Sequence, residues 1–166
     1  MRVYLIGITG CGKSTLGIAI AQKLGYKFVD LDDYIIEQQG KSIEQIFEND
    51  GEIFFRKLEE KALLELNDDY LVVSTGGGAP CFFNNMQYMM AQGKTVWLNP
   101  DAEVVADRLF ASPNSQNRPL LKNRTKADVL EFVINKTKER QKFYSQAEVI
   151  ITHNNITPEM ILNALS

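Results

Sequence analysis

The sequence is poor in the residues that build disulfide-bonded or metal-clustered scaffolds. Its 166 residues include two cysteines, Cys11 and Cys81, and a single histidine, His153. Two cysteines are too few for a disulfide framework, so we expect a reducing compartment, the cytoplasm. We assign no catalytic role to the lone histidine.

Long apolar runs and an excess of basic residues are also missing. No stretch approaches the roughly 18 apolar residues of a membrane-spanning helix. The apolar residues 3–6 run into a glycine loop rather than into a signal-peptide cleavage site. The net charge is −3, whereas nucleic-acid binders usually carry a basic excess. We therefore expect neither a membrane nor a nucleic-acid partner.

Strand and helix patterns alternate along the chain, which predicts an α/β fold. Strands are predicted at 2–6, 27–30, 71–74, 94–98 and 147–151. Helices are predicted at 13–24, about 32–39, 42–48, 51–66, about 82–92, after 99–101, about 125–143 and 158–165. The length suits one domain, residues 1–166, with a five-stranded, mostly parallel sheet between two helix layers. Ligands of such sheets bind beyond the carboxyl ends of the strands.

The first loop carries a phosphate-binding pattern. Residues 7–14, Gly-Ile-Thr-Gly-Cys-Gly-Lys-Ser, fit G-x-x-x-x-G-K-[ST] and lie between a predicted strand and a predicted helix. In this motif backbone N–H groups surround a phosphate, the lysine (Lys13) reaches the β- and γ-phosphates, and the hydroxyl (Ser14) binds Mg²⁺. A plain glycine turn is the alternative.

The segment 111–124 is predicted to be a mobile loop, because it is polar, contains two prolines and lacks apolar periodicity. Residues 108–126 hold five basic residues and no acidic one. We expect this segment to become ordered when nucleotide binds.

Several motifs beyond the phosphate loop occur in one order along the chain. They are Asp30-Leu31-Asp32, Gly40-Lys41-Ser42-Ile43, Ile46-Phe47, Gly51-Glu52 with Phe55-Arg56, Gly76-Gly77-Gly78, Arg118-Pro119-Leu120-Leu121, and Arg140 followed by Tyr144. With the phosphate loop, this series strongly resembles the shikimate kinase family from about residue 4 to 148.

The resemblance implies a P-loop kinase of the nucleoside-monophosphate-kinase-like fold with a mobile lid. It implies transfer of the ATP γ-phosphoryl to the 3-hydroxyl of shikimate, in the pathway to chorismate and the aromatic amino acids, by a monomer. The substrate-binding helices fall at about 31–66 and the lid at about 109–126.

The resemblance also implies roles for individual residues. Asp32, Lys13 and Arg118 are the expected catalytic residues, and Ser14 and Asp30 the Mg²⁺ residues. ATP is expected to contact Gly10, Cys11, Gly12, Lys13, Ser14, Thr15, Arg108 and Arg118. Shikimate is expected to contact Asp32, Arg56, Gly77, Gly78 and Arg140, with Phe47 and Phe55 forming an apolar wall.

The residues themselves support these roles, but each has a simpler reading. An Asp at a strand end beside the P-loop can accept or orient a hydroxyl proton, as in other kinases, whereas Asp33 is expected only to cap a helix. The guanidinium groups of Arg56 and Arg140 suit a planar carboxylate, although each arginine could instead form a surface ion pair with a nearby glutamate. The glycine triplet suits close approach to a ligand, but a flexible turn is the alternative. Trp97 and the Met89-Met90 pair are expected in or near the core.

Three features depart from the family pattern. The lid segment is a few residues longer than expected, and Thr9 and Cys11 replace more usual loop residues. The Cys11 thiol is expected at a helix N-terminus near Lys13, which would favour a reactive thiolate. An inert, buried side chain is the alternative.

Two other functions remain open from the sequence. One is a different small-metabolite kinase of the same fold, such as a gluconate-type or nucleoside monophosphate kinase. The other is a non-catalytic module that uses ATP as a switch.

Overall fold

The computed structural model describes residues 1–112 and 123–166. A single parallel sheet has the strand order β2-β3-β1-β4-β5. Its strands are β1 (Arg2–Ile6), β2 (Lys27–Asp30), β3 (Leu71–Ser74), β4 (Lys94–Leu98) and β5 (Val149–Ile151). The expected five-stranded parallel sheet is therefore confirmed.

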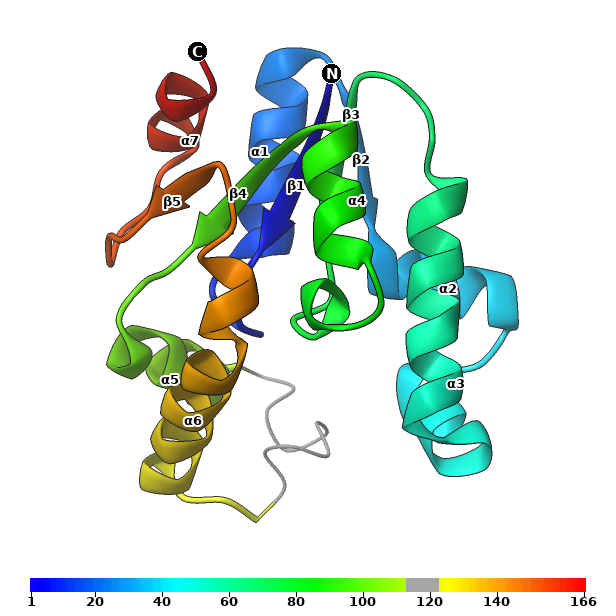
Figure 1. Cartoon of the computed structure of the whole chain (residues 1–166). Helices are drawn as coiled ribbons and strands as arrows, with labels where there is room; N and C mark the ends of the chain where they lie inside the picture. The colour runs from blue at the N-terminus through cyan, green and yellow to red at the C-terminus, as the bar shows by residue number, and fades with distance from the viewer. Residues whose placement is uncertain (113–122) are drawn as a thin grey trace.

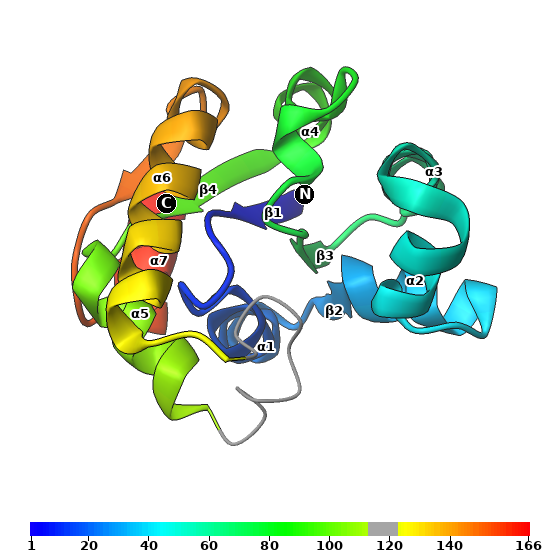
Figure 2. The same cartoon turned by 90° about the horizontal axis from the view of Figure 1, so that it is seen from below.

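Helices cover both faces of the sheet (Figures 1 and 2). They are α1 (Lys13–Leu24), α2 (Leu31–Gln39), α3 (Ile43–Glu65), α4 (Asn85–Gln92), α5 (Ala102–Ala111), α6 (Lys126–Tyr144) and α7 (Pro158–Leu165), with a short 3₁₀ turn η1 (Ala79–Cys81). Figure 2 shows α1 and α4 on opposite sides of the sheet, so the three-layer architecture is confirmed.

Two apolar cores follow from the alternation of side chains along each strand. In β1, Val3 and Leu5 face the core shared with α1, α5 and α7, whereas Tyr4 and Ile6 face the core shared with α2, α3 and α4. Helix α6 contributes Val129 and Val133 to the first core and Tyr144 to the second. Helix α6 thus spans both halves of the molecule.

The helices predicted at 42–48 and 51–66 correspond to the two arms of α3, because Gly51 (φ 84°) breaks the helical backbone between them. Two other local predictions differ from the structure. The helix predicted from 82 begins at Asn85, because Pro80 lies in the η1 turn and Phe83 has a left-handed backbone (φ 51°). The last strand begins at Val149, since residues 145–147 form the turn that follows α6.

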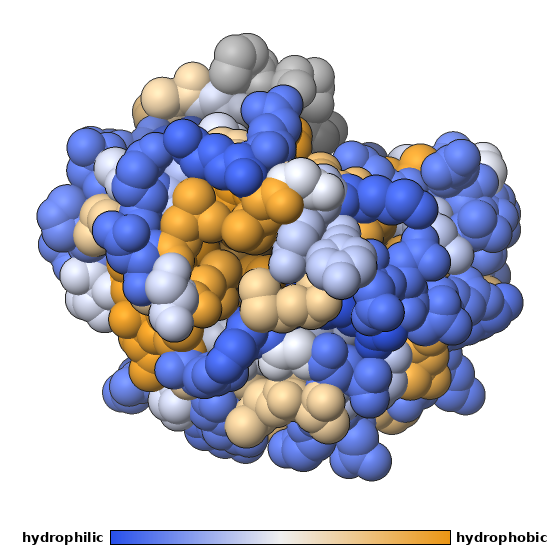
Figure 3. Space-filling model, turned by 90° about the horizontal axis from the view of Figure 1, so that it is seen from above, coloured by the Kyte–Doolittle hydropathy of each residue, from blue (hydrophilic) through white to orange (hydrophobic). Residues whose placement is uncertain are grey.

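The strands place their carboxyl ends at the lower edge of Figure 1, where β1 leads into the glycine loop. The opposite face is shown in Figure 3, where apolar side chains gather on the side that carries α7 and β5 in Figure 1. Helix α7 contributes Leu162 and Leu165, which pack against the core but stay partly exposed. The motifs that the sequence analysis selected lie at the carboxyl edge instead.

Candidate active site

The loop from Gly7 to Gly12 joins β1 to α1 and depends on its glycines. Gly7, Gly10 and Gly12 have φ angles of 139°, 87° and 105°, which side chains other than glycine rarely adopt. A Cβ on Gly7 would lie 2.6 Å from the Leu98 carbonyl oxygen. The glycines thus allow a tight loop directly against β4, as a phosphate loop requires.

Lys13 begins α1 and its side chain folds back over this loop. Its ammonium group donates hydrogen bonds to the carbonyl oxygens of Gly7 (2.8 Å) and Ile8 (3.0 Å), and the residue is buried. A buried cation needs such acceptors, because burial without them is costly. Lys13 is therefore held at the floor of the loop, where it can meet a phosphate.

Ser14, Asp30 and Ser74 form a cluster at the ends of three elements. The Ser14 hydroxyl donates to Asp30 Oδ2 (2.6 Å) and lies 3.2 Å from the Ser74 hydroxyl. Asp30 ends β2 and Ser74 ends β3, in register with each other. The sequence analysis did not select Ser74; its position at a strand end before the glycine triplet was the available signal.

Asp30 also caps α2, which corrects the expectation for Asp33. Asp30 Oδ1 accepts a hydrogen bond from the Asp32 N–H (3.1 Å), whereas Asp33 is exposed and makes no capping bond. The cap falls on Asp30 because β2 ends there and its backbone is still extended (φ −88°, ψ 124°).

Asp32 lies in the first turn of α2 and lines the same cavity as the phosphate loop. Burial, followed by the negative charge of Asp30, raises the pKa of Asp32 from 3.8 to about 6. Its Oδ1 atom has no hydrogen-bond partner among the residues that the structure describes. A carboxylate of raised pKa with a free oxygen suits proton transfer or orientation of a hydroxyl.

Arg56 lies on α3 and is buried rather than at the surface. Its guanidinium donates to Glu59 (2.6 Å) and to Glu52 (3.2 Å), and it lies 4.3 Å from the centre of the Phe82 ring. Helical ion pairs are thus present, as the alternative reading of Arg56 expected, but the arginine is buried and not at the surface. Of the two predicted wall residues, Phe55 is buried but Phe47 is 36% exposed, and their rings pack against each other (centroids 4.7 Å apart).

Glu59 is a second buried carboxylate that the sequence analysis did not select. Burial, countered by Arg56 and reinforced by Asp32, raises the pKa of Glu59 from 4.5 to about 7. Its Oε1 atom, like the free oxygen of Asp32, has no partner in the described part of the chain. The i,i+3 spacing to Arg56 was the available signal, but burial could not be read from it.

Each glycine of the triplet faces a different side chain of the site. A Cβ on Gly76 would lie 2.5 Å from Glu59 Oε1 and 3.1 Å from Asp32 Oδ1. A Cβ on Gly77 would lie 2.9 Å from Arg140 Nη1, and one on Gly78 would lie 2.5 Å from Arg56 Nη1. The triplet therefore brings together two carboxylates and two guanidinium groups, which a plain turn would not require.

Two adjoining cavities surround the triplet. The larger, about 690 Å³, is lined by the phosphate loop, Asp30, Asp32, Ser74, Thr75, Gly76, Gly77 and Arg108. The smaller, about 260 Å³, is lined by Glu52, Arg56, Cys81, Phe82, Lys136, Glu139, Arg140, Lys142 and Phe143. Gly77 lines the first cavity and faces Arg140 in the second. Arg140 thus approaches the phosphate loop at this glycine, because a Cβ on Gly77 would also lie 3.4 Å from the backbone nitrogen of Thr9.

Two of the predicted nucleotide residues, Arg108 and Thr15, line the larger cavity, whereas a third, Arg118, lies outside the described residues. Arg108 on α5 lines the larger cavity and donates to the carbonyl oxygens of Cys11 (3.4 Å) and Asn154 (3.1 Å), which ties the loop after β5 to the phosphate loop. Thr15 lines that cavity as well. Arg118 and most of the predicted lid lie outside the described residues, 113–122 being omitted.

Cys11 does not face the phosphate loop as expected. The residue is fully buried in the core that α1 shares with α5, and a Cβ on Gly7 would meet its sulfur at 2.9 Å. The thiol thus packs beneath the loop, out of reach of solvent, with the Lys13 ammonium 3.8 Å from its sulfur. Its burial favours the inert alternative, and the reactivity of the thiol stays a prediction. Cys81 is half-buried, and burial raises the pKa of its thiol to about 11.

The core predictions hold for two of three residues. Trp97 and Met89 are buried, but Met90 is 46% exposed, because successive residues of α4 face different directions.

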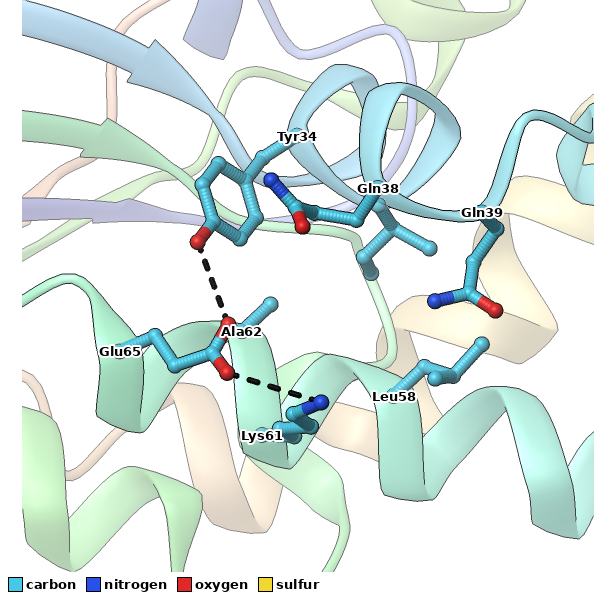
Figure 4. A pocket seen from close by; sticks show the side chains of 8 residues that line it. Tyr34, Gln38, Gln39, Leu58, Lys61, Ala62 and Glu65 are labelled. Carbon is cyan, nitrogen blue, oxygen red and sulfur yellow. Dashed lines mark hydrogen bonds and ion pairs between the residues drawn. The ribbon is translucent and has the colours of Figure 1, made fainter.

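A separate cavity of about 150 Å³ lies between α2 and α3 (Figure 4). Its polar groups satisfy one another: the Tyr34 hydroxyl donates to Glu65 (3.2 Å), and Lys61 pairs with Glu65 (3.6 Å). None of the selected site residues lines this cavity. The chemistry therefore concentrates at the phosphate loop and the glycine triplet.

The described residues contain no cluster of three or more histidine, cysteine or acidic side chains that could hold a metal alone. Mg²⁺ does not need such a cluster, since it is usually bound by one or two protein oxygens together with substrate phosphates and water. In the described ranges, no helix is long and apolar enough to span a bilayer.

A parallel sheet with this loop, a hydroxyl–carboxylate pair and a second pocket beside it defines a P-loop phosphotransferase. The shikimate kinase family model matches residues 9–166. A shikimate kinase from Azobacteroides pseudotrichonymphae genomovar. CFP2 is 39% identical over 99% of this chain and 96% of the relative. The chain belongs to the shikimate kinase family.

Solved structures agree. A shikimate kinase from Bacteroides thetaiotaomicron has a TM-score of 0.91 and 38% identity, covering 99% of this chain and 94% of that one. One from Acinetobacter baumannii, in complex with shikimate, has a TM-score of 0.86 and 32% identity, covering 98% and 88%. A gluconokinase from Sinorhizobium meliloti 1021, at 16% identity and a TM-score of 0.56, covers 99% of this chain and 89% of that one and shares the fold alone.

Proposed function

We propose that this enzyme transfers the γ-phosphoryl group of ATP to the 3-hydroxyl of shikimate. The observation that carries the proposal is the glycine triplet, which places Asp32, Arg140 and Arg56 against successive glycines beside the phosphate loop. Shikimate has hydroxyl groups at one side of its ring and a carboxylate at the other. A carboxylate at the first glycine and arginines at the second and third match that distribution.

We assign ATP to the larger cavity. The loop N–H groups and Lys13 would hold its β- and γ-phosphates, and Thr15 and Arg108 line the remaining wall. The family assigns Arg118 to the closing of the site over ATP, and that residue lies outside the described part of the chain.

The hydroxyl of Ser14 and the carboxylate of Asp30 fit Mg²⁺, because both are hard oxygen donors and already lie 2.6 Å apart beside the loop. When bound, the ion would neutralise negative charge on the ATP phosphates. Ser74, 3.2 Å from the Ser14 hydroxyl, would orient that hydroxyl.

The acceptor hydroxyl would lie against Asp32. The free oxygen of this carboxylate can accept the hydroxyl proton or hold the oxygen in line with the γ-phosphorus. Lys13 would stabilise the charge on the phosphoryl oxygens during transfer. The acceptor carboxylate would pair with Arg56 and Arg140, whose planar guanidinium groups can each donate two parallel hydrogen bonds.

We further propose that residues 1–166 act as one domain and as a monomer in the cytoplasm. Every residue assigned above comes from one chain, and both cysteines are free, which suits a reducing compartment. Sedimentation velocity on the purified protein tests the monomer, and a dimer at assay concentration would contradict it.

A coupled assay of ADP release tests the activity. Shikimate, gluconate and a nucleoside monophosphate are each added to enzyme, ATP and Mg²⁺. We expect ADP release to depend on shikimate and to be at background with the other two acceptors. Dependence on gluconate would favour the other metabolite kinase, and ATP binding without release with any acceptor would favour the non-catalytic module.

A further inference from the structure

Tyr144, the last residue of α6, holds the backbone of the glycine triplet. Its hydroxyl donates a hydrogen bond to the carbonyl oxygen of Gly77, 67 positions away in the sequence. The side chain is fully buried in the second core, where its ring packs against Trp97 (ring centroids 5.6 Å apart). A buried hydroxyl is costly without a partner, and here the partner is a peptide of the candidate acceptor site.

Arg140 lies one helical turn before Tyr144, on the same face of α6. Its Nη1 atom lies 2.9 Å from the place where a Cβ on Gly77 would be. Helix α6 thus contacts Gly77 twice, through its carbonyl oxygen and through the space left by its missing side chain. The position of Arg140 and the orientation of the Gly77 carbonyl are set by one rigid element.

A fixed carbonyl fixes the next N–H group as well. The Gly77–Gly78 peptide is trans, so its C=O and N–H bonds point in opposite directions. Because the carbonyl points toward Tyr144, the Gly78 N–H points away from Tyr144. Gly78 also adjoins the Arg56 guanidinium, since a Cβ there would lie 2.5 Å from Nη1. An acceptor carboxylate held by Arg56 therefore has a backbone donor beside it.

We propose that Tyr144 is a positioning residue that orients the Gly77–Gly78 peptide, so that the Gly78 N–H and Arg140 together receive the carboxylate of the acceptor. This inference rests on the proposed assignment of Arg56, Arg140 and the triplet to the acceptor. Tyr144 itself touches no reacting atom and acts through the peptide plane.

The test is Tyr144→Phe, which removes the hydroxyl and keeps the ring. Shikimate and ATP KM values, kcat, and the Kd of shikimate by calorimetry are measured with thermal unfolding. Loss of one positioned neutral hydrogen bond should raise the Kd and KM for shikimate about two- to tenfold. The KM for ATP should change less, because Tyr144 donates its hydrogen bond to Gly77 and not to the phosphate loop, although Gly77 borders that loop at Thr9.

Tyr4→Phe is the matched control. Tyr4 is equally buried in the same core, but its hydroxyl has no hydrogen-bond partner among the described residues. Its removal should leave shikimate binding unchanged and should not lower the melting temperature. An equal rise in the shikimate Kd for both variants would overturn the inference, since the effect would then come from the core in general.

A lower melting temperature in Tyr144→Phe with unchanged shikimate Kd and KM would also overturn it, because the hydroxyl would then stabilise the fold only. The Arg140→Lys variant shows whether an unchanged shikimate affinity in Tyr144→Phe rejects only the role of Tyr144 or the whole assignment of this site to shikimate. Weaker shikimate binding in Arg140→Lys with normal binding in Tyr144→Phe rejects the role of Tyr144 alone. Normal binding in both variants rejects the acceptor site as well.

Discussion

At the scale of single residues, Asp32 has the environment of a proton acceptor. Burial and Asp30 raise its pKa to about 6, so it is mostly ionised at neutral pH and still basic enough to take part in proton transfer. Asp32→Asn keeps the size of the side chain and should keep the fold and ATP binding. We expect turnover to fall by about 10²–10⁴. Steady-state kinetics and ATP binding are measured for this variant. Near-normal turnover would show that Asp32 takes no part in the mechanism.

Arg56 forms ion pairs with Glu52 and Glu59, whereas no such pair is found for Arg140 among the described residues, and this difference is testable. Arg56→Lys and Arg140→Lys should each weaken shikimate binding by about 1.5–3 kcal/mol, because a point charge replaces a fork of donors. Arg56→Lys should also lower the melting temperature, since Arg56 pairs with the buried Glu59 at 2.6 Å. The kinetics of both variants with each substrate check this. An unchanged KM for shikimate together with a raised KM for ATP would mean that the two arginines bind ATP and not shikimate.

Single residues also show the limits of sequence reasoning. Lys13 and Ser14 could be selected because the spacing of the phosphate-loop motif fixes their place at the start of α1. Asp30 and Asp32 could be selected from the family resemblance and from their place where β2 ends. The burial of the Cys11 side chain could not be predicted, because the sequence of a loop does not show which of its side chains point toward the core. Glu59 could not be told from its exposed neighbour Glu52, because both lie at helical spacing from Arg56 and only tertiary contacts bury one of them.

At the scale of elements, the strands were predictable because their apolar runs end at glycine or polar residues. The start of α4 was not, because a proline turn and the left-handed Phe83 follow the triplet. The two arms of α3 were predicted separately, and Gly51 does interrupt the backbone between them. The packing of α6 across both cores has no signature in its own sequence pattern.

The glycine triplet offers a test at this scale. Gly78 has an ordinary backbone conformation (φ −89°, ψ −18°), so alanine there strains no dihedral angle. Its Cβ would instead lie 2.5 Å from Arg56 Nη1 and displace the guanidinium. We expect Gly78→Ala to fold and to raise the KM for shikimate about tenfold or more, comparable to loss of a charged hydrogen bond.

Gly40→Ala is the control for this variant. Gly40 has φ 62° and open space around its missing Cβ, so alanine there strains the backbone by about 1–2 kcal/mol but touches nothing. We expect a lower melting temperature and normal shikimate kinetics. A normal KM for shikimate in Gly78→Ala would show that the space in front of this glycine is not needed to place Arg56.

At the scale of the whole molecule, the two buried carboxylates predict how stability depends on pH. The pKa values of Asp32 and Glu59 are raised from 3.8 to about 6 and from 4.5 to about 7. Between about pH 4 and 7 the folded protein therefore binds more protons than the unfolded chain. The protonated carboxyl groups of Asp32 and Glu59 therefore stabilise the fold fully below about pH 4, and this stabilisation is lost as the pH rises through 6 and 7.

Chemical denaturation of the wild type and of Asp32→Asn across pH 4–8 measures this contribution. Carboxylates far from Asp32 change alike in both proteins and cancel, whereas Glu59 loses the charge of Asp32, which lowers the pKa of Glu59 and changes the difference between the two curves in the same direction. We expect the variant to gain stability relative to the wild type as the pH rises from 4 to above 6. A constant difference across this range would mean that the pKa of Asp32 is not raised in the folded protein.

The identity of the phosphorylated product tests the central claim most directly. Enzyme, Mg²⁺, ATP and shikimate are incubated, and the product is characterised by mass spectrometry and by phosphorus–proton NMR correlation. We predict one phosphate per shikimate, attached to the 3-oxygen, with one ADP formed for each. Phosphate on another hydroxyl, or ADP with free phosphate and unchanged shikimate, would contradict the assignment of Asp32, Arg56 and Arg140 to this acceptor.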